Sequence, residues 1–182
     1  MRVCLHLADG FEEIEAISVA DILRRAAIPV QMVSIMGKKE VMGAHNIGVI
    51  TDVLFENVDY SNVDMMILPG GGRGTQNMAE HSGLTEQLTK QAMDGKWIAA
   101  ICAAPTVLGK LGLLAGKAAA CYPGCESELT GAIVSVSPSV IVDGKIITSR
   151  GPGTSFDFAL KIVEILKGAE VTNSLKEQMI IA

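Results

Sequence analysis

Short apolar segments alternate with segments of helical length along this chain, and that alternation constrains the fold more than any other feature. The apolar segments read as buried strands, and the longer segments carry apolar residues at helical spacing. The central strands are apolar on both faces, which is typical of a parallel sheet covered by helices on both sides. The strands are expected at residues 2–8, 29–35, 64–68 and 97–101, and the helices at residues 13–27, 83–93, 154–167 and from Pro105 onward.

Two further segments look like hairpins outside this alternation. Residues 37–51 carry three turn-forming residues, Gly43, Asn46 and Gly48, which predicts a hairpin or an excursion from the main sheet. Residues 139–149 contain Asp143-Gly144, which suits a type I′ turn between two strands. The chain shows no repeat, low-complexity tract or linker, so we expect one domain over residues 1–182.

Composition excludes several classes of protein. Hydrophobic residues make up 49% and charged residues 19%, which excludes a disordered chain. The net charge of −5 and the lack of a basic block argue against a nucleic-acid partner. The longest uncharged stretch, residues 129–142, is too short to span a membrane. The acidic N-terminal segment lacks the apolar core of a secretory signal, so we expect a cytoplasmic protein that needs neither membrane nor nucleic acid.

The four cysteines and three histidines give no metal-binding pattern. None of the cysteines forms a Cys-x-x-Cys pair, and the histidines are scattered singly. We therefore expect free thiols, with no metal and no cofactor.

Cys102 is the first candidate for chemistry. It follows the apolar strand 97–101 directly and precedes two alanines and Pro105, which suits a first helical turn. This is the layout of a nucleophile elbow, a sharp strand-to-helix turn that exposes a nucleophile. Free N–H groups at the helix start would favour a thiolate and lower the pKa of the thiol. A buried core cysteine fits the same pattern about equally well.

Glu15 is the second candidate. Val19, Ile22 and Ala26 fall within about 40° of it on the helical wheel, so this carboxyl group lies in an apolar stripe. Burial there would raise its pKa and could make it a proton donor. The alternative is a glutamate placed near a helix N-terminus by the helix dipole, which Glu12 and Glu13 fit better.

Two glycine-containing segments follow strands. Residues 68–74 (LPGGGRG) are not a phosphate-binding loop, but their glycines could present backbone N–H groups to an oxyanion. A plain tight loop explains them as well. Residues 149–154 (SRGPGT) could bind an anion at a helix start, although a segment of this kind is more often only a cap formed by Thr154.

Four motifs in order resemble the ThiJ/PfpI superfamily over essentially the whole chain. They are ADGFEEIE at 8–15, LPGG at 68–71, AICAAP at 100–105 and TSRGPGTSFDFAL at 148–160. The similarity is greatest to its DJ-one branch, the parkinsonism-associated protein deglycases. This resemblance implies a flavodoxin-like α/β three-layer sandwich with a mostly parallel sheet, related to class I glutamine amidotransferases, and a homodimer with Ile14 near its seam.

The resemblance also implies roles for individual residues. Cys102 is the expected nucleophile and Glu15 its hydrogen-bonding partner. The remaining oxyanion-hole and substrate-site residues are expected to be Gly70, Gly71, Ala103, Tyr122 and Pro152, with residues 150–153 at the rim.

One departure bears on the type of reaction. Relatives with a Cys-His pair carry a histidine where this chain has Tyr122, and His45 falls where some relatives have an arginine. We therefore expect a Cys102–Glu15 dyad rather than a Cys-His-Glu triad, with a thiolate beside a protonated Glu15 at neutral pH.

Three functions follow as hypotheses. The first is a glutathione-independent glyoxalase or deglycase, an enzyme that acts on methylglyoxal, glyoxal or their adducts. The second is a redox-sensing chaperone or stress-response protein in which Cys102 is oxidised to a sulfinate. The third is an intracellular peptidase or amidase, which the missing histidine disfavours.

Overall fold

A seven-stranded sheet forms the centre of the computed structural model, which describes residues 1–181. The spatial order of its strands is β10-β11-β7-β6-β1-β2-β5, and only β10 runs antiparallel to its neighbour. The strands are β1 (Val3–Leu7), β2 (Val30–Ser34), β5 (Val53–Leu54), β6 (Met65–Leu68), β7 (Trp97–Ile101), β10 (Val140–Asp143) and β11 (Ile146–Ser149). The pairings confirm the predicted mostly parallel sheet. β1, β6 and β7 are buried along nearly their whole length, which explains why they are apolar on both faces.

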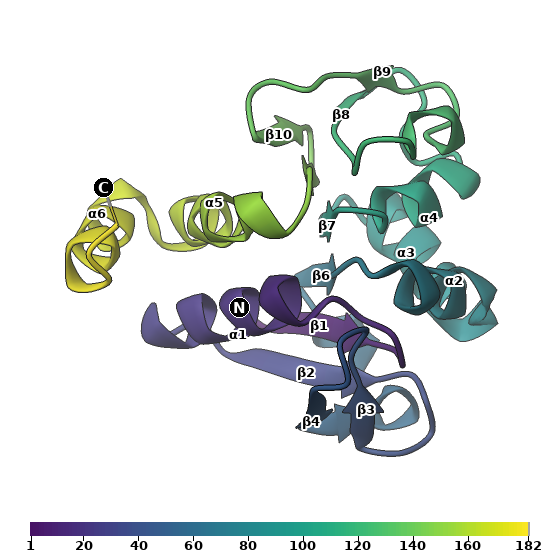
Figure 1. Cartoon of the computed structure of the whole chain (residues 1–182), viewed down its shortest axis with the longest axis horizontal. Helices are drawn as coiled ribbons and strands as arrows, with labels where there is room; N and C mark the ends of the chain where they lie inside the picture. The colour runs from purple at the N-terminus through teal and green to yellow at the C-terminus, as the bar shows by residue number, and fades with distance from the viewer. Residues whose placement is uncertain (182) are drawn as a thin grey trace.

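Helices cover both faces of this sheet (Figure 1). One layer holds α1, α5 and α6, and the opposite layer holds α2, α3 and α4. The bounds are α1 (Glu13–Arg25), α2 (Gly72–Glu80), α3 (Ser82–Met93), α4 (Pro105–Lys110), α5 (Ser155–Lys167) and α6 (Ala169–Gln178). Each layer packs a separate cluster of buried apolar residues against the sheet, so the predicted three-layer α/β sandwich is confirmed.

The segments outside the main sheet form two small sheets. The predicted hairpin within residues 37–51 is present as β3 (Glu40–Met42) and β4 (Gly48–Ile50), which pair with each other. The second small sheet joins β8 (Ala118–Ala119) and β9 (Ile133–Val134), which the sequence did not predict. Hydrogen bonds from Gly10 to the Met42 carbonyl and from Ala44 to the Phe11 carbonyl dock the β3–β4 hairpin against the loop before α1.

Two local expectations were wrong. The turn between β10 and β11 is Gly144-Lys145, with positive φ only at Gly144, as in a type II′ turn rather than type I′. At the start of α3, His81 rather than Ser82 caps the helix through its imidazole, which accepts the Leu84 N–H at 3.0 Å. The second wrong expectation concerns α5. Thr154 precedes α5 without capping it, because its hydroxyl bonds Gly151 and Ser149 instead.

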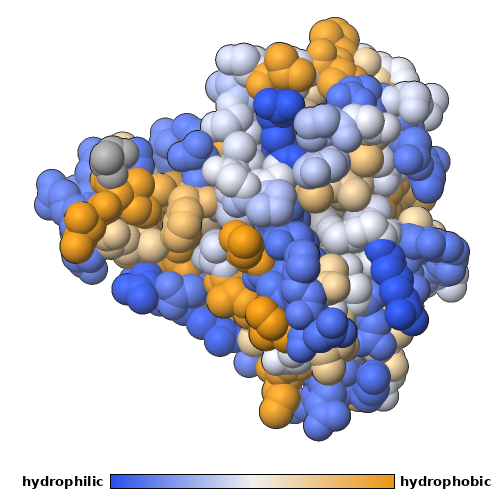
Figure 2. Space-filling model, in the orientation of Figure 1, coloured by the Kyte–Doolittle hydropathy of each residue, from blue (hydrophilic) through white to orange (hydrophobic). Residues whose placement is uncertain are grey.

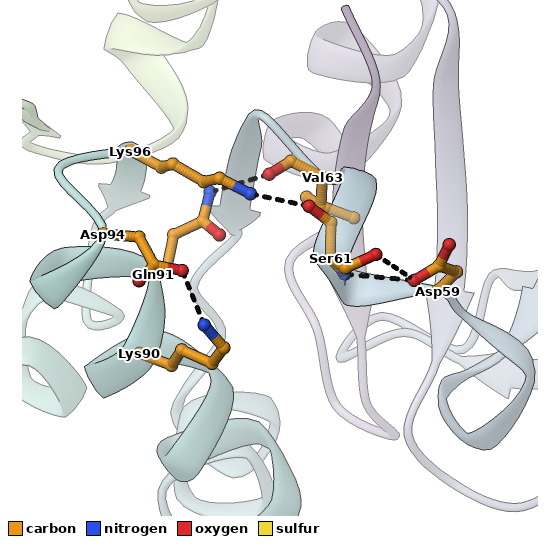
Figure 3. Close-up of polar contacts among 7 residues, drawn as sticks. All are labelled: Asp59, Ser61, Val63, Lys90, Gln91, Asp94 and Lys96. Atoms are coloured by element: carbon orange, nitrogen blue, oxygen red, sulfur yellow. Dashed lines mark hydrogen bonds and ion pairs between the residues drawn. The ribbon is translucent and has the colours of Figure 1, made fainter.

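Polar contacts align the start of β7 with the segment before β6 (Figure 3). The Lys96 ammonium donates to the Ser61 carbonyl at 2.9 Å, and the buried Gln91 amide donates to the Val63 carbonyl at 3.5 Å and the Trp97 carbonyl at 3.3 Å. These contacts fix the amino ends of two neighbouring strands, so the carboxyl ends also lie side by side. Among the described helices, none is both long and apolar enough to cross a bilayer.

His6, in the middle of β1, is fully buried on the α3 side of the sheet. Its Nε2 lies 3.0 Å from the Tyr60 hydroxyl, and its ring stacks on that of Tyr60. Burial lowers the pKa of His6 to about 3, so the ring is neutral in the folded protein.

We predict that His6 makes the fold sensitive to acid. The unfolded chain binds a proton at this residue near pH 6.5 but the folded chain does not, so stability is lost as pH falls below 6.5. Relative to His6→Gln, wild type should lose about 2 kcal/mol of unfolding free energy between pH 6.5 and 5. Urea unfolding at several pH values measures this difference. A difference between the two proteins that stays constant down to pH 5 would contradict the prediction.

Candidate active site

Three chain segments meet where β1, β6 and β7 end at the same edge of the sheet. These strands are neighbours in the order β7-β6-β1, so the loops that follow them converge. They supply the first turn of α1 with Glu15, the Gly70-Gly71 pair and the Cys102 turn. This is the position at which open parallel sheets carry their functional sites.

Cys102 occupies a left-handed backbone conformation between β7 and α4. Its φ is +65°, which is unfavourable for a residue with a side chain, and holding it there takes on the order of 1 kcal/mol or more. Two hydrogen bonds hold the turn: the Cys102 N–H donates to the Ser149 carbonyl at 3.0 Å, and the Tyr122 N–H donates to the Cys102 carbonyl at 2.8 Å. The strand-turn-helix geometry is that of a nucleophile elbow, with the residue 7% exposed.

Glu15 reaches the same point from the first turn of α1. Glu12 caps this helix, and its carboxylate accepts the Glu15 N–H at 2.7 Å. The Glu15 carboxyl is fully buried, accepts the Gly70 N–H at 2.7 Å through Oε2 and lies beside the Cys102 thiol. Its other oxygen, Oε1, is buried with no hydrogen-bond partner in the described chain.

Gly70 fills the space between these two side chains. A Cβ at this position would lie 2.5 Å from the Cys102 Cβ, 2.8 Å from Glu15 Oε2 and 2.9 Å from Cys102 Sγ. All three distances are too short for real contacts, so the sulfur and the carboxyl can approach each other only across a glycine.

Burial dominates the electrostatics of this pair. Burial raises the pKa of Glu15 to about 7, although the Gly70 N–H and the Cys102 thiol oppose the shift. Burial, followed by the charge and hydrogen bond of Glu15, raises the pKa of Cys102 to about 12. Since each negative charge disfavours the other, the pair carries at most one negative charge near neutral pH.

The direction of the Cys102 shift corrects the sequence-based expectation. The N–H groups of Gly71 and Ala103 do lower the pKa of the thiol, as the helix-start argument requires. They are outweighed because the sulfur is buried beside a carboxyl group that a distant part of the chain supplies. The thiol therefore keeps its proton until that proton has an acceptor.

Gly71 and Ala103 present their N–H groups to the Cys102 sulfur from opposite segments. Gly71 has φ +90°, and a Cβ there would lie 2.2 Å from the Gly10 carbonyl oxygen, so only glycine fits. The structure thus brings five of the predicted site residues together: Cys102, Glu15, Gly70, Gly71 and Ala103.

Tyr122 and Pro152 lie on the rim rather than among these five. Tyr122 is 49% exposed, and its ring packs against Gly151, the residue before Pro152. Its only recorded bond to the elbow is through its backbone N–H. Arg150 lies beside them, with its Nε buried and unpaired within residues 1–181. Thr154 uses its hydroxyl on the Gly151 backbone, so the SRGPGT segment is closed by local hydrogen bonds and does not cap α5.

The three histidines are engaged elsewhere. His6 pairs with Tyr60, His81 caps α3, and His45 Nδ1 lies 2.8 Å from a Glu13 carboxylate oxygen. The carboxyl group of Glu15 is accordingly the proton acceptor that touches the thiol.

Sequence reasoning missed a cleft next to the elbow. It has a volume of about 560 Å³ and lies between α2, α4 and the 3-10 turn η3 (Glu126–Glu128). Gly72 and Ala103 border it, and Thr75, Thr106 and Cys125 also line it. The glycines at the start of α2 favour a loop locally, so the sequence does not predict the helix that forms one wall of this cleft.

We predict that a methyl group is tolerated at Gly72 but not at Gly70. Gly70→Ala forces the Cys102 and Glu15 side chains apart and should lower the unfolding free energy by about 1–3 kcal/mol. Gly72→Ala, where a Cβ meets nothing within 4 Å, should be neutral or stabilise α2 by up to about 1 kcal/mol. Urea unfolding of the two variants compares them directly. Equal stabilities would contradict the packing described for Gly70.

Comparison with known proteins adds independent support for the fold and the family. Residues 1–165 match the DJ-1/PfpI family. Protein dj-1beta of Drosophila melanogaster is 40% identical over 97% of this chain and 95% of its own length. A glutathione-independent glyoxalase, DJR-1.2 of Caenorhabditis elegans, is 37% identical over 94% of this chain and 91% of its own. A deglycase of Pyrococcus abyssi is 32% identical over 92% of this chain and its whole length.

A solved structure shows the same architecture. Oxidised DJ-1 of Toxoplasma gondii superposes with a TM-score of 0.94 at 35% identity, and covers 100% of this chain and 98% of its own. The resemblance predicted from the four motifs is confirmed. By its sequence, its fold and its relatives, the chain belongs to the DJ-1/PfpI family.

Proposed function

We propose that this protein is a cysteine-dependent, glutathione-independent glyoxalase with a related deglycase activity. The observation that supports this most is the buried approach of the Cys102 thiol to the Glu15 carboxyl across Gly70, flanked by the Gly71 and Ala103 N–H groups. Relatives named as a glyoxalase and a deglycase cover nearly the whole chain and support the same reaction class. The proposed substrates are methylglyoxal, glyoxal and their adducts.

Proton transfer to Glu15 makes the thiol a nucleophile in this proposal. As the Cys102 sulfur attacks the aldehyde carbon, its proton passes to the adjacent carboxylate. The N–H groups of Gly71 and Ala103 stabilise the oxyanion that develops on the former carbonyl oxygen. Glu15 then passes this proton to the oxyanion, so the product of the step is a neutral hemithioacetal and Glu15 is again a carboxylate.

The same carboxyl group then moves a second proton. The Glu15 carboxylate removes the hydrogen from the former aldehyde carbon, while the hydroxyl proton of the hemithioacetal passes to the neighbouring carbonyl oxygen, which gives an enediolate. Glu15 then returns its proton to the neighbouring carbon. The resulting thioester on Cys102 is hydrolysed by water, which releases lactate from methylglyoxal or glycolate from glyoxal and regenerates the thiol. No net oxidation occurs, because one carbon is oxidised while its neighbour is reduced. A pKa of Glu15 near 7 suits a group that must both accept and donate.

We expect activity to depend on both members of the dyad. Cys102→Ala should abolish methylglyoxal consumption, and Glu15→Gln should lower kcat/KM by about 100-fold or more, since the amide cannot take the proton. The assay follows methylglyoxal loss and lactate formation without glutathione. Cys4→Ala is the matched control, because that thiol lies near the amino end of β1, opposite the strand ends that form the site, and its removal should leave turnover intact.

Circular dichroism must show that each variant is folded. Full activity in Cys102→Ala would overturn the proposal, and full activity in Glu15→Gln would remove Glu15 from the mechanism.

A second candidate function is redox sensing by the same thiol. One observation favours it: a Cys102 sulfinate would find the Glu15 carboxyl and two N–H groups already placed around it. A wild-type protein that is inactive while reduced, yet takes up oxygen at Cys102 alone during peroxide titration by intact mass, would favour sensing over catalysis.

We propose further that the chain forms a homodimer through the face shared by α1 and the β3–β4 hairpin. Several large apolar side chains are exposed on this face, and Figure 2 shows apolar surface over the region. The exposed residues on these elements are Ile14, Ile17, Met42, Ile47 and Ile50. Ile14 lies one residue from Glu15, so this face borders the candidate site.

Charge on this face should separate the subunits. Ile47→Glu, at a side chain that is 57% exposed, should convert a dimer to a monomer of 19.1 kDa. Met93→Glu on α3, on the other side of the sheet, is the control and should leave the mass unchanged. Sedimentation velocity gives both masses. A wild-type protein that sediments as a monomer would refute the dimer.

A further inference from the structure

A carboxylate–imidazole cluster lies where the β3–β4 hairpin meets the N-terminus of α1. It consists of Glu12, Glu13 and His45, and one ligand atom from each lies within 4.8 Å of the others. The mechanism proposed above uses none of these three side chains in a chemical step.

Glu13 is held in place by the hairpin. Its Oε1 accepts the N–H groups of His45 at 2.6 Å and Ile47 at 3.4 Å. A Cβ on Gly43 would collide with this carboxylate, so a glycine makes the room for it. The second oxygen, Oε2, faces His45 Nδ1 at 2.8 Å.

Glu12 is held in a similar way. Its Oε2 accepts the Glu15 N–H at 2.7 Å, which leaves Oε1 with no hydrogen bond among residues 1–181. The two carboxyl-bearing residues are only 7% and 5% exposed. Each carboxylate thus has one oxygen fixed by backbone N–H groups and one oxygen directed elsewhere, which is how outer-shell contacts orient metal ligands.

The cluster of Glu12, Glu13 and His45 holds more negative than positive charge. Within the described chain, His45 is the one basic group that pairs with Glu13, with its Nδ1 2.8 Å from Oε2. Asp9 and Lys38 from the adjacent segments pair with each other at 3.8 Å. Two buried carboxylates therefore share one imidazole, and a cation there would be stabilised.

We propose that Glu12, Glu13 and His45 form a binding site for a divalent cation of the Zn²⁺, Ni²⁺ or Cu²⁺ type. An imidazole nitrogen with two carboxylate oxygens suits these ions, whereas Mg²⁺ and Ca²⁺ prefer oxygen ligands alone. The remaining coordination positions are filled by water. The ion takes the place of the hydrogen between His45 Nδ1 and Glu13 Oε2.

Ion binding requires the cluster to contract. Ligand atoms at about 2.0–2.2 Å from an ion lie at most about 4.4 Å apart, so any separation near the 4.8 Å bound must shorten. Backbone N–H groups hold one oxygen of each glutamate, whereas the His45 side chain is 70% exposed in the single chain. The bound ion would fasten the β3–β4 hairpin to the helix that carries Glu15.

Metal titration of the full chain tests this site independently of any enzyme activity. Zn²⁺ binding is measured by calorimetry, and Co²⁺ serves as a spectroscopic probe because thiolate ligands give a strong charge-transfer absorption that imidazole and carboxylate ligands do not. We expect one ion per chain and no thiolate absorption.

Variants identify the ligands. His45→Ala and Glu12→Gln should each weaken Zn²⁺ binding by tenfold or more, and the Gln side chain can still accept the Glu15 N–H. Glu40→Gln, an exposed carboxylate on the same hairpin, is the matched control and should bind as wild type does. If His45→Ala does not fold, Glu12→Gln decides the matter alone.

Absence of binding, thiolate absorption with Co²⁺, or unchanged affinity in the two ligand variants would each overturn the proposal. Methylglyoxal turnover by the metal-free protein is measured separately, so a failure of the metal site leaves the glyoxalase proposal standing, and the reverse also holds.

Discussion

The close approach of Glu15 to Cys102 across Gly70 is the constraint on which the candidate site depends. The Gly70 N–H holds one carboxyl oxygen at 2.7 Å, and its missing side chain lets the sulfur reach that carboxyl. Three separate loops must end at one edge of the sheet for this contact to form, which is why the order β7-β6-β1 matters. The strained backbone of Cys102 and the positive φ of Gly71 persist because neighbouring strands and loops hold them. Burial at this point raises the pKa of both groups. The doubly charged state is therefore disfavoured, and the pair can pass one proton between sulfur and carboxyl.

The main elements of the fold could be predicted from local patterns, and the missed ones lacked such patterns. β7 lies at residues 97–101 as expected, because an uninterrupted apolar run leaves little choice of boundaries. α2 was missed because Gly72 and Gly74 disfavour a helix locally, while packing of Met78 and Thr75 against the sheet overrides that preference. The sequence does not predict α6 either. This helix buries only Thr172 and Leu175, which are too few positions to give a recognisable helical periodicity of apolar residues. The strands β5, β8 and β9 are two residues long and exist only through their partners.

The identity of the candidate site residues was more predictable than their electrostatics. Cys102 stands out because it ends an apolar strand, and Glu15 because it interrupts an apolar helix face; the structure joins the two. The pKa of the thiol was expected to fall, since the sequence shows the helix start but not the buried carboxyl beside it. The cluster of Glu12, Glu13 and His45 left no local signal, because the imidazole comes from a hairpin that is distant in sequence from the acids. Residues from different segments meet through the sheet topology, which a local pattern does not encode.

The protonation of Glu15 tests the central claim most directly. Carbon-13 labelling of the glutamate side chains, with the signal assigned by its loss in Glu15→Gln, allows the carboxyl group to be titrated by NMR in the intact protein. The account predicts a midpoint near pH 7, because burial disfavours the carboxylate. Such a value would mean that the group next to Cys102 can both take and give a proton under neutral conditions. A midpoint near pH 4.5 would contradict the account, since the carboxylate would then be solvated and permanently charged, and the shared-proton dyad would not exist.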